Sequence, residues 1–127
     1  IEYSDHLKFK PGTAGQNILN AMTEKQMTEA YIVNDDQLLL GKINVLSLVE
    51  DRENYMEKME KTPVTLSSDF ALTEAIEIAS NFVGESIPIV EEKRLVGAIT
   101  EGDLFTKVLA LEDDLRNEET EYGASNK

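Results

Sequence analysis

The chain has 127 residues, of which 41% are apolar, so one domain with a packed core is possible. Its 25 acidic and 12 basic residues give a net charge of −13, and such a surface repels nucleic acids and anionic lipids. The absence of cysteine excludes disulfides and thiolate metal sites and suits the cytoplasm. We find no run of 18 apolar residues and no signal peptide. The start at Ile1 rather than Met suggests a piece of a longer protein.

The first half of the chain predicts two helices and three strands. They are a marginal strand near Phe9, a helix over 15–26, strands over 30–33 and 38–43, and a helix from about Val45. A charge-rich segment follows and precedes the second half. We divide the chain into a leader (1–7), a first repeat (8–50), a linker (51–61), a second repeat (62–111) and an acidic tail (112–127) that we expect to be disordered.

The second half predicts the same element order. The expected elements are a strand over 64–66, a helix over 72–82 that ends at Gly84, strands over 87–90 and 95–100, and a helix that runs through Leu111 or further. Pro88 has no N–H group for a strand ladder, so we expect it at the edge of a sheet or the end of a strand.

An internal repeat relates the two halves. Residues 7–33 align without a gap on residues 64–90 at an offset of 57. After one extra residue in the turn of the first copy, residues 39–48 align on 95–104 at an offset of 56. Neither copy is long enough to bury a sufficient core alone. We therefore predict an α/β fold in which two strand-helix-strand-strand-helix units pack about a pseudo-twofold axis.

The junction of the last strand with the last helix carries a hydroxyl and a carboxylate, Thr100 and Asp103, around a glycine. If the helix begins near Thr100, both oxygens lie at its first turn, where N–H groups lack partners. Two interpretations remain open. The pair caps the helix and contributes about 1 kcal/mol, or it binds a ligand whose hydroxyls reach the carboxylate.

The repeat and this motif resemble a known family. Two copies of about 57 residues with this element order resemble a tandem CBS pair, also called a Bateman module. The segment 97–103 fits that family's pattern of Gly, two residues, Thr or Ser, two residues and Asp. The segment 86–90 fits its second strand. The resemblance covers about residues 7–111, and the second copy matches better than the first.

The resemblance implies clefts between the repeats that bind adenosine compounds such as AMP, ADP, ATP or S-adenosylmethionine. It implies that Asp103 holds the ribose hydroxyls and that Thr100 lies close to the ribose or phosphate. The base would lie among residues of the first and second strands of the second repeat. The residues carried over for the base are Thr62, Val64, Ile87 and Pro88.

The first repeat departs from the pattern, with Asn44 in place of Thr and Ser47 in place of Asp. Ser47 cannot present a carboxylate, so we expect at most one good nucleotide site. The net charge of −13 also repels polyphosphates at long range. Adenosine or its monophosphate is therefore easier to accommodate than ATP. Cations that a phosphate would need are Lys42, Lys93, Arg94 and Lys107.

We interpret the chain as a regulatory binding module and not as an enzyme, because no nucleophile, base or metal-ligand constellation is present. His6 is interpreted as a solvated surface residue, and Tyr31 as a core residue that is also placed to stack on a base. The alternative is a structural dimerisation module with degenerate sites. The segments 75–90 and 100–105 are also similar to the cytosolic tails of some bacterial chloride-channel-type transporters. That similarity implies a homodimer fused to a larger protein, such as an inner-membrane transporter.

Overall fold

The structure is a computed structural model that describes residues 3–81, 85–107 and 109–110. It contains two three-stranded sheets, each with its strands in sequence order. The first half contributes β1 (Lys8–Phe9), α1 (Gly15–Lys25), β2 (Glu29–Val33), β3 (Leu39–Asn44), α2 (Val45–Glu50) and α3 (Tyr55–Lys58). The second half contributes β4 (Leu66–Ser67), α4 (Leu72–Ala79), β5 (Ser86–Glu91) and β6 (Arg94–Thr100). Residues 101–107 and 109–110 are helical.

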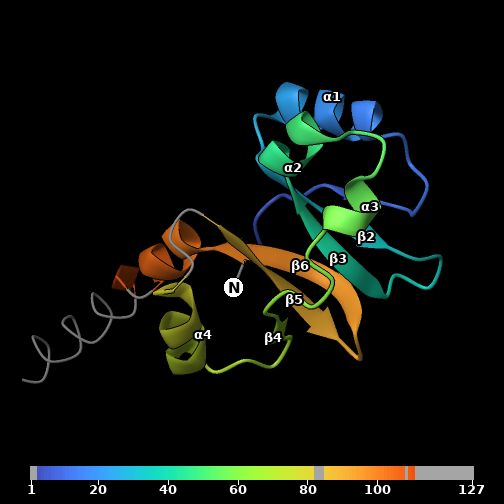
Figure 1. The fold of residues 1–127 in the computed structure, drawn as a ribbon. Helices are drawn as coiled ribbons and strands as arrows, with labels where there is room; N and C mark the ends of the chain where they lie inside the picture. The colour runs from blue at the N-terminus through green and yellow to red at the C-terminus, as the bar shows by residue number, and fades with distance from the viewer. Residues whose placement is uncertain (1–2, 82–84, 108, 111–127) are drawn as a thin grey trace, which may run out of the picture.

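The two sheets lie in the middle of the molecule, with α1 and α2 at one end and α4 at the other (Figure 1). In each sheet the first strand runs parallel to the second, and the second runs antiparallel to the third. Phe9 pairs with Ile32, and Leu66 pairs with Ile89, so the pairing register repeats at the offset of 57 found in the sequence. The predicted α/β fold of two repeats is confirmed.

The two hairpins meet each other through a reciprocal pair of backbone hydrogen bonds. The N–H of Leu39 donates to the carbonyl of Lys93 at 3.0 Å, and the N–H of Leu95 donates to the carbonyl of Gln37 at 2.9 Å. Each partner lies 56 residues from its counterpart. Gln37 and Lys93 also share a left-handed backbone, with φ of 68° and 67°. The two repeats are therefore related by a local pseudo-twofold axis that passes between these hairpins.

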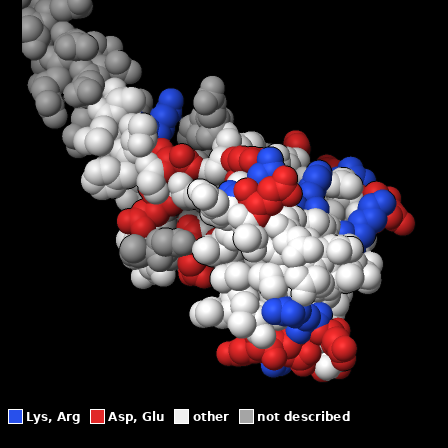
Figure 2. All heavy atoms as spheres, turned by 90° about the horizontal axis from the view of Figure 1, so that it is seen from above, with Lys and Arg blue, Asp and Glu red and all other residues white. Residues whose placement is uncertain are grey.

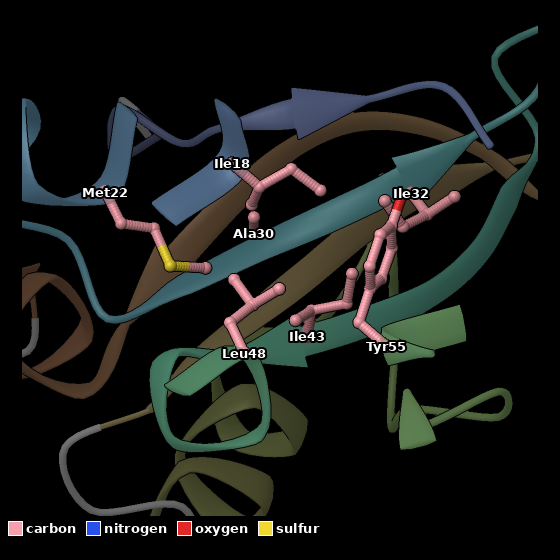
Figure 3. Close-up of a cluster of buried hydrophobic side chains, with 7 residues drawn as sticks. All are labelled: Ile18, Met22, Ala30, Ile32, Ile43, Leu48 and Tyr55. Atoms are coloured by element: carbon pink, nitrogen blue, oxygen red, sulfur yellow. The ribbon is translucent and has the colours of Figure 1, made fainter. Parts of the chain in front are cut away.

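Each repeat has its own apolar core, and a third cluster joins the two. Ile18 and Met22, one helical turn apart on α1, pack on Ala30, Ile32 and Ile43 of the first sheet (Figure 3). The remaining members of this first core are Leu48 and Tyr55. The second core consists of Leu66, Ala75, Ala79, Ile87, Ile89, Ile99 and Leu104. The cluster of Tyr31, Val33, Leu95 and Ala98 lies between the sheets and forms the seam.

The segment before each repeat crosses to the other repeat. The N–H of Ser4 donates to the carbonyl of Ala98 at 2.7 Å, and Glu60 exchanges two hydrogen bonds with Lys42, each of 2.9 Å. A Cβ atom at Gly97 would overlap the ring of Tyr3, and one at Gly41 would lie 2.6 Å from the sulfur of Met59. The two glycines align in the repeat, so each keeps room for the crossing segment.

Pro88 differs from its prediction, because it lies inside β5, the central strand of the second sheet. The prediction that it sits at an edge or end is wrong. Tyr31, its counterpart in the first repeat, donates its N–H to the carbonyl of Leu7 on the β1 side. On the corresponding side of β5, pairing with β4 begins only at Ile89. The missing N–H of Pro88 therefore faces a position where no ladder bond forms.

The predicted helix end at Gly84, Leu111 and the acidic tail 112–127 lie outside the described residues. Among the described residues, no helix is long and apolar enough to cross a membrane. Figure 2 shows that the charged side chains on the face turned to the viewer form separate groups, with uncharged surface between them.

Candidate functional site

A cavity of about 740 Å³ opens at the seam between the repeats. Its volume lies in the range of small-molecule sites. The leader and the start of β2 form one wall, and the start of β5 with the Thr100 corner forms the other. The lining residues are Asp5, His6, Gln26, Met27, Thr28, Glu29, Tyr31, Glu85, Ser86, Thr100, Glu101, Gly102 and Phe105.

Thr100 and Asp103 form a capping box at the start of the last helix. The hydroxyl of Thr100 accepts a hydrogen bond from the N–H of Asp103 at 3.1 Å. The carboxylate of Asp103 in turn accepts from the N–H of Thr100 at 3.2 Å and from its hydroxyl at 2.8 Å. The pair therefore caps the helix, and Thr100 also lines the cavity. Ligand binding by the pair stays a prediction.

The leader adds a further donor to this carboxylate. The hydroxyl of Ser4, 99 residues away in the sequence, donates to Oδ2 of Asp103. Partial burial alone raises the pKa of Asp103, but the hydrogen bonds from Ser4 and Thr100 outweigh it and bring the pKa below its usual value. Asp103 is therefore held as a carboxylate that accepts hydroxyl donors, which is the chemistry that ribose recognition requires.

A buried polar network crosses the seam beside the cavity. The carboxylate of Glu29 accepts from the N–H and hydroxyl of Ser86 at 2.7 and 2.9 Å. Lys42 lies 2.5 Å from the other oxygen of Glu29 and donates to the carbonyl of Ser86 at 3.0 Å. The side chains of Lys42 and Glu29 are 6% and 12% exposed. The network therefore ties β2 and β3 of one repeat to β5 of the other.

Two aromatic rings close the cavity at the leader. His6 and Tyr31 contact edge to face, with ring centroids 6.1 Å apart and planes at 67°. His6 is half-buried where the leader crosses to the second repeat, and its interpretation as a solvated surface residue stays a prediction. The phenol of Tyr31 bonds to the hydroxyl of Ser86. Burial raises the pKa of Tyr31, so this phenol stays protonated.

The six residues predicted for binding lie in three places. Thr100 lines the cavity, and Asp103 is not among the lining residues but bonds to Thr100. Ile87 and Pro88 are buried in the second repeat, and Thr62 and Val64 are exposed; none of these four lines the cavity. The contacts of these residues with a ligand stay predictions.

The segments opposite Thr100 come instead from the first repeat. Tyr31, the counterpart of Pro88 at an offset of 57, does line the cavity. The leader residues Asp5 and His6 line it as well, because the leader crosses to the second repeat. Sequence reasoning missed these two leader residues and Thr28. The internal repeat is the signal that could have indicated them, because it makes the leader equivalent to the segment that precedes the second repeat.

The described residues also form two smaller cavities. One, of about 110 Å³, is lined by Lys42, Asn44, Ser47, Lys58, Glu60 and the two acids Glu29 and Glu85. It contains the motif of the first repeat that differs from the family pattern. In this motif Asn44 caps α2 by accepting from the N–H of Ser47 at 2.9 Å. It is too small for a nucleoside. The other, of about 530 Å³, lies at the start of α1 beside Arg52 and Tyr55.

No group of three His, Cys, Asp or Glu in the described part of the chain is placed to hold a metal ion.

The sequence model of the CBS domain family matches residues 49–110. This part of the chain is therefore similar to a CBS domain, and the described residues have the fold of a tandem CBS pair. OpuCA of Staphylococcus aureus has this fold with a TM-score of 0.75 and 17% identity, over 86% of this chain and 97% of that one.

Solved structures with the same fold carry adenosine ligands. CBSX2 from Arabidopsis thaliana, in complex with AMP, has a TM-score of 0.70 and 21% identity over 84% of this chain and 89% of that one. MJ0100, with 5′-methylthioadenosine and S-adenosylmethionine, has a TM-score of 0.68 and 16% identity, over 81% and 91%. The cytosolic domain of the Mg²⁺ channel MgtE, with ATP, has a TM-score of 0.71 and 20% identity, over 80% and 44%.

A curated relative is much longer than this chain. The A-adding tRNA nucleotidyltransferase of Aquifex aeolicus (strain VF5) is 28% identical over 98 residues, which cover 73% of this chain. The match spans 12% of the length of that protein.

Proposed function

We propose that the chain is a regulatory module that binds an adenosine compound in the seam cavity. The observation that carries the proposal is the composition of the cavity wall. Residues of both repeats line it, and the Thr100 corner lies on it. The ligand-bound CBS pairs with the same fold support the choice of adenosine compounds.

Within this proposal, Asp103 accepts the ribose hydroxyls and Thr100 positions its carboxylate. The hydroxyl of Ser4 now occupies that carboxylate, so a ribose would take its place. We assign the base to the apolar wall of Met27, Tyr31 and Phe105. Thr62, Val64, Ile87 and Pro88 lose that role in our proposal, because they lie away from the cavity that Thr100 lines.

Regulation follows from the position of the cavity. A ligand that contacts both repeats favours the relative orientation of the repeats that fits it. The ligand then biases an attached domain by its difference in affinity for the two orientations. This role makes the chain a binding module rather than an enzyme. The MgtE cytosolic domain and the tRNA nucleotidyltransferase support attachment to a larger protein, a channel or an enzyme. The cytosolic tail of a chloride-channel-type transporter stays a prediction from the sequence.

The test is a thermal-shift panel of adenosine, 5′-methylthioadenosine, S-adenosylmethionine, AMP, ADP and ATP. A compound at about 100 times its Kd stabilises the folded chain by about 2.7 kcal/mol, which raises Tm by roughly 8–16 °C. Asp103→Asn should abolish the shift. Asp69→Asn, the same change at an exposed turn outside the cavity, should leave it intact.

The alternative is a structural dimerisation module. The observation in its favour is that Val49 and Phe105, counterparts at an offset of 56, are 59% and 64% exposed. Apolar side chains at matching places on two helices suit a symmetric contact. A chain that dimerises in analytical ultracentrifugation but shows no thermal shift with any adenosine compound has this function instead.

A further inference from the structure

The charged residues of the seam cavity determine which adenosine compounds fit it. Four carboxylates line the cavity, from Asp5, Glu29, Glu85 and Glu101, and no Lys or Arg is among its described lining residues. We infer that the cavity selects an adenosine compound without phosphate groups, either uncharged or positively charged. This inference rests on the proposed function and names the ligand class of the same site.

Lys42, which contacts residues of this wall, already has partners there. Lys42 pairs with Glu29 at 2.5 Å and with Glu85 at 3.5 Å, and it donates to the carbonyl of Ser86 at 3.0 Å. Its side chain is 6% exposed and belongs to the smaller cavity. Using it for a phosphate would break a buried ion pair, which is strongly unfavourable.

The other cations considered for a phosphate lie elsewhere. Lys93 and Arg94 belong to the hairpin that pairs with residues 37–39, and neither lines the cavity. Lys107 lies on the last helix and is also absent from the lining. A phosphate in the cavity would therefore face carboxylates with no Lys or Arg among the described lining residues to offset its charge.

The acids of the cavity are also unequal in how far they are neutralised. Glu29 is paired with Lys42 at 2.5 Å, and Glu85 forms a longer ion pair with the same lysine at 3.5 Å. Asp5 and Glu101 form no salt bridge with any described residue. Negative charge at these two positions attracts a sulfonium or ammonium group and repels a phosphate.

The ligand class is tested by isothermal titration of the chain with 5′-methylthioadenosine, S-adenosylmethionine, AMP and ATP at low and high salt. We expect S-adenosylmethionine to bind most tightly, followed by methylthioadenosine, with AMP about tenfold weaker than S-adenosylmethionine and ATP weakest. Added salt should weaken S-adenosylmethionine, leave methylthioadenosine unchanged and strengthen AMP, because it screens the carboxylates.

Glu101→Gln should lower the ratio of the affinities for S-adenosylmethionine and AMP several-fold. The affinity for methylthioadenosine should not change. Glu77→Gln, on the exposed face of α4, is the matched control and should change none of them. Tighter binding of AMP or ATP than of methylthioadenosine at low salt would overturn the ligand class and leave the proposed function standing. Binding of none of the four compounds would overturn both.

Discussion

Glu29 and Ser86 occupy the same position in the two repeats, and they bond to each other. Oε1 of Glu29 accepts from both the N–H and the hydroxyl of Ser86. A position that meets its own counterpart lies close to the pseudo-twofold axis. Because one repeat has an acid there and the other a hydroxyl, the axis carries a negative charge, and Lys42 compensates it.

The Glu29–Lys42 pair yields the first prediction. Lys42→Met leaves a buried carboxylate without its cation, which should cost about 3–5 kcal/mol in the free energy of unfolding. Glu29→Gln combined with Lys42→Met removes both charges and should recover more than half of that loss. Urea unfolding of the single and double variants measures the coupling. A double variant less stable than Lys42→Met alone would show that the two side chains do not act as a pair.

The capping box yields the second. Thr100→Ala removes the acceptor for the N–H of Asp103 and a donor to its carboxylate. The loss should be about 1 kcal/mol and should appear as a Tm lower by roughly 3–6 °C. Thr106→Ala is the matched control, since this exposed hydroxyl bonds back to the carbonyl of Gly102 within the helix. An equal loss in both variants would argue against a capping role for Thr100.

Acid should remove the contribution of Asp103. Hydrogen bonds hold its pKa in the folded chain below that in the unfolded chain, so they stabilise the folded state at neutral pH. This stability is fully present above the unfolded pKa of about 3.9 and is lost as pH falls through the folded pKa. The difference in unfolding free energy between the wild type and Asp103→Asn should therefore shrink below about pH 4. A difference that grows on acidification would contradict the assignment.

The repeat architecture could be predicted because apolar residues recur at matching positions in the two halves of the sequence. The positions of Ile32 and Ile89, or of Gly41 and Gly97, recur at constant offsets, and burial forces that periodicity on any sequence with this fold. The place of Pro88 could not be predicted, since whether its missing N–H matters depends on where β4 begins to pair.

The site was predictable in part. Spacing alone placed Thr100 and Asp103 at a helix start, where the structure has them. The opposite wall could not be derived from spacing, because the crossing of the leader is a tertiary event. It depends on the contact of Tyr3 with Gly97, two residues far apart in the sequence. No local sequence pattern predicts that contact. The burial of Lys42 likewise depends on a partner in another strand.

The crossing leader yields the next prediction. In Gly97→Ala the new Cβ overlaps the ring of Tyr3, so the leader must move, at a cost of about 1–3 kcal/mol. The amide of Ser4, which donates to Ala98, should lose its protection from hydrogen exchange. In Gly102→Ala the new Cβ meets nothing nearer than 3.8 Å, and the leader amides should stay protected. Unchanged protection in Gly97→Ala would mean that the leader is not held by this contact.

Removal of the Ser4 hydroxyl should favour the ligand. Because a ribose must replace this hydroxyl at Asp103, Ser4→Ala should strengthen the binding of 5′-methylthioadenosine by about threefold, less than a full hydrogen bond to a charged group. Ser80→Ala, on the exposed end of α4, should not change the affinity. Weaker binding by Ser4→Ala in calorimetry would instead make Ser4 part of the binding surface.

The most direct test of the central claim maps the ligand on the chain by two-dimensional ¹H–¹⁵N NMR during titration with 5′-methylthioadenosine. A site at the seam predicts shifts of amides from both repeats, at residues 28–31 and 100–102 together. Shifts confined to residues 12–16 and 52–56, around the cavity at the start of α1, would contradict it.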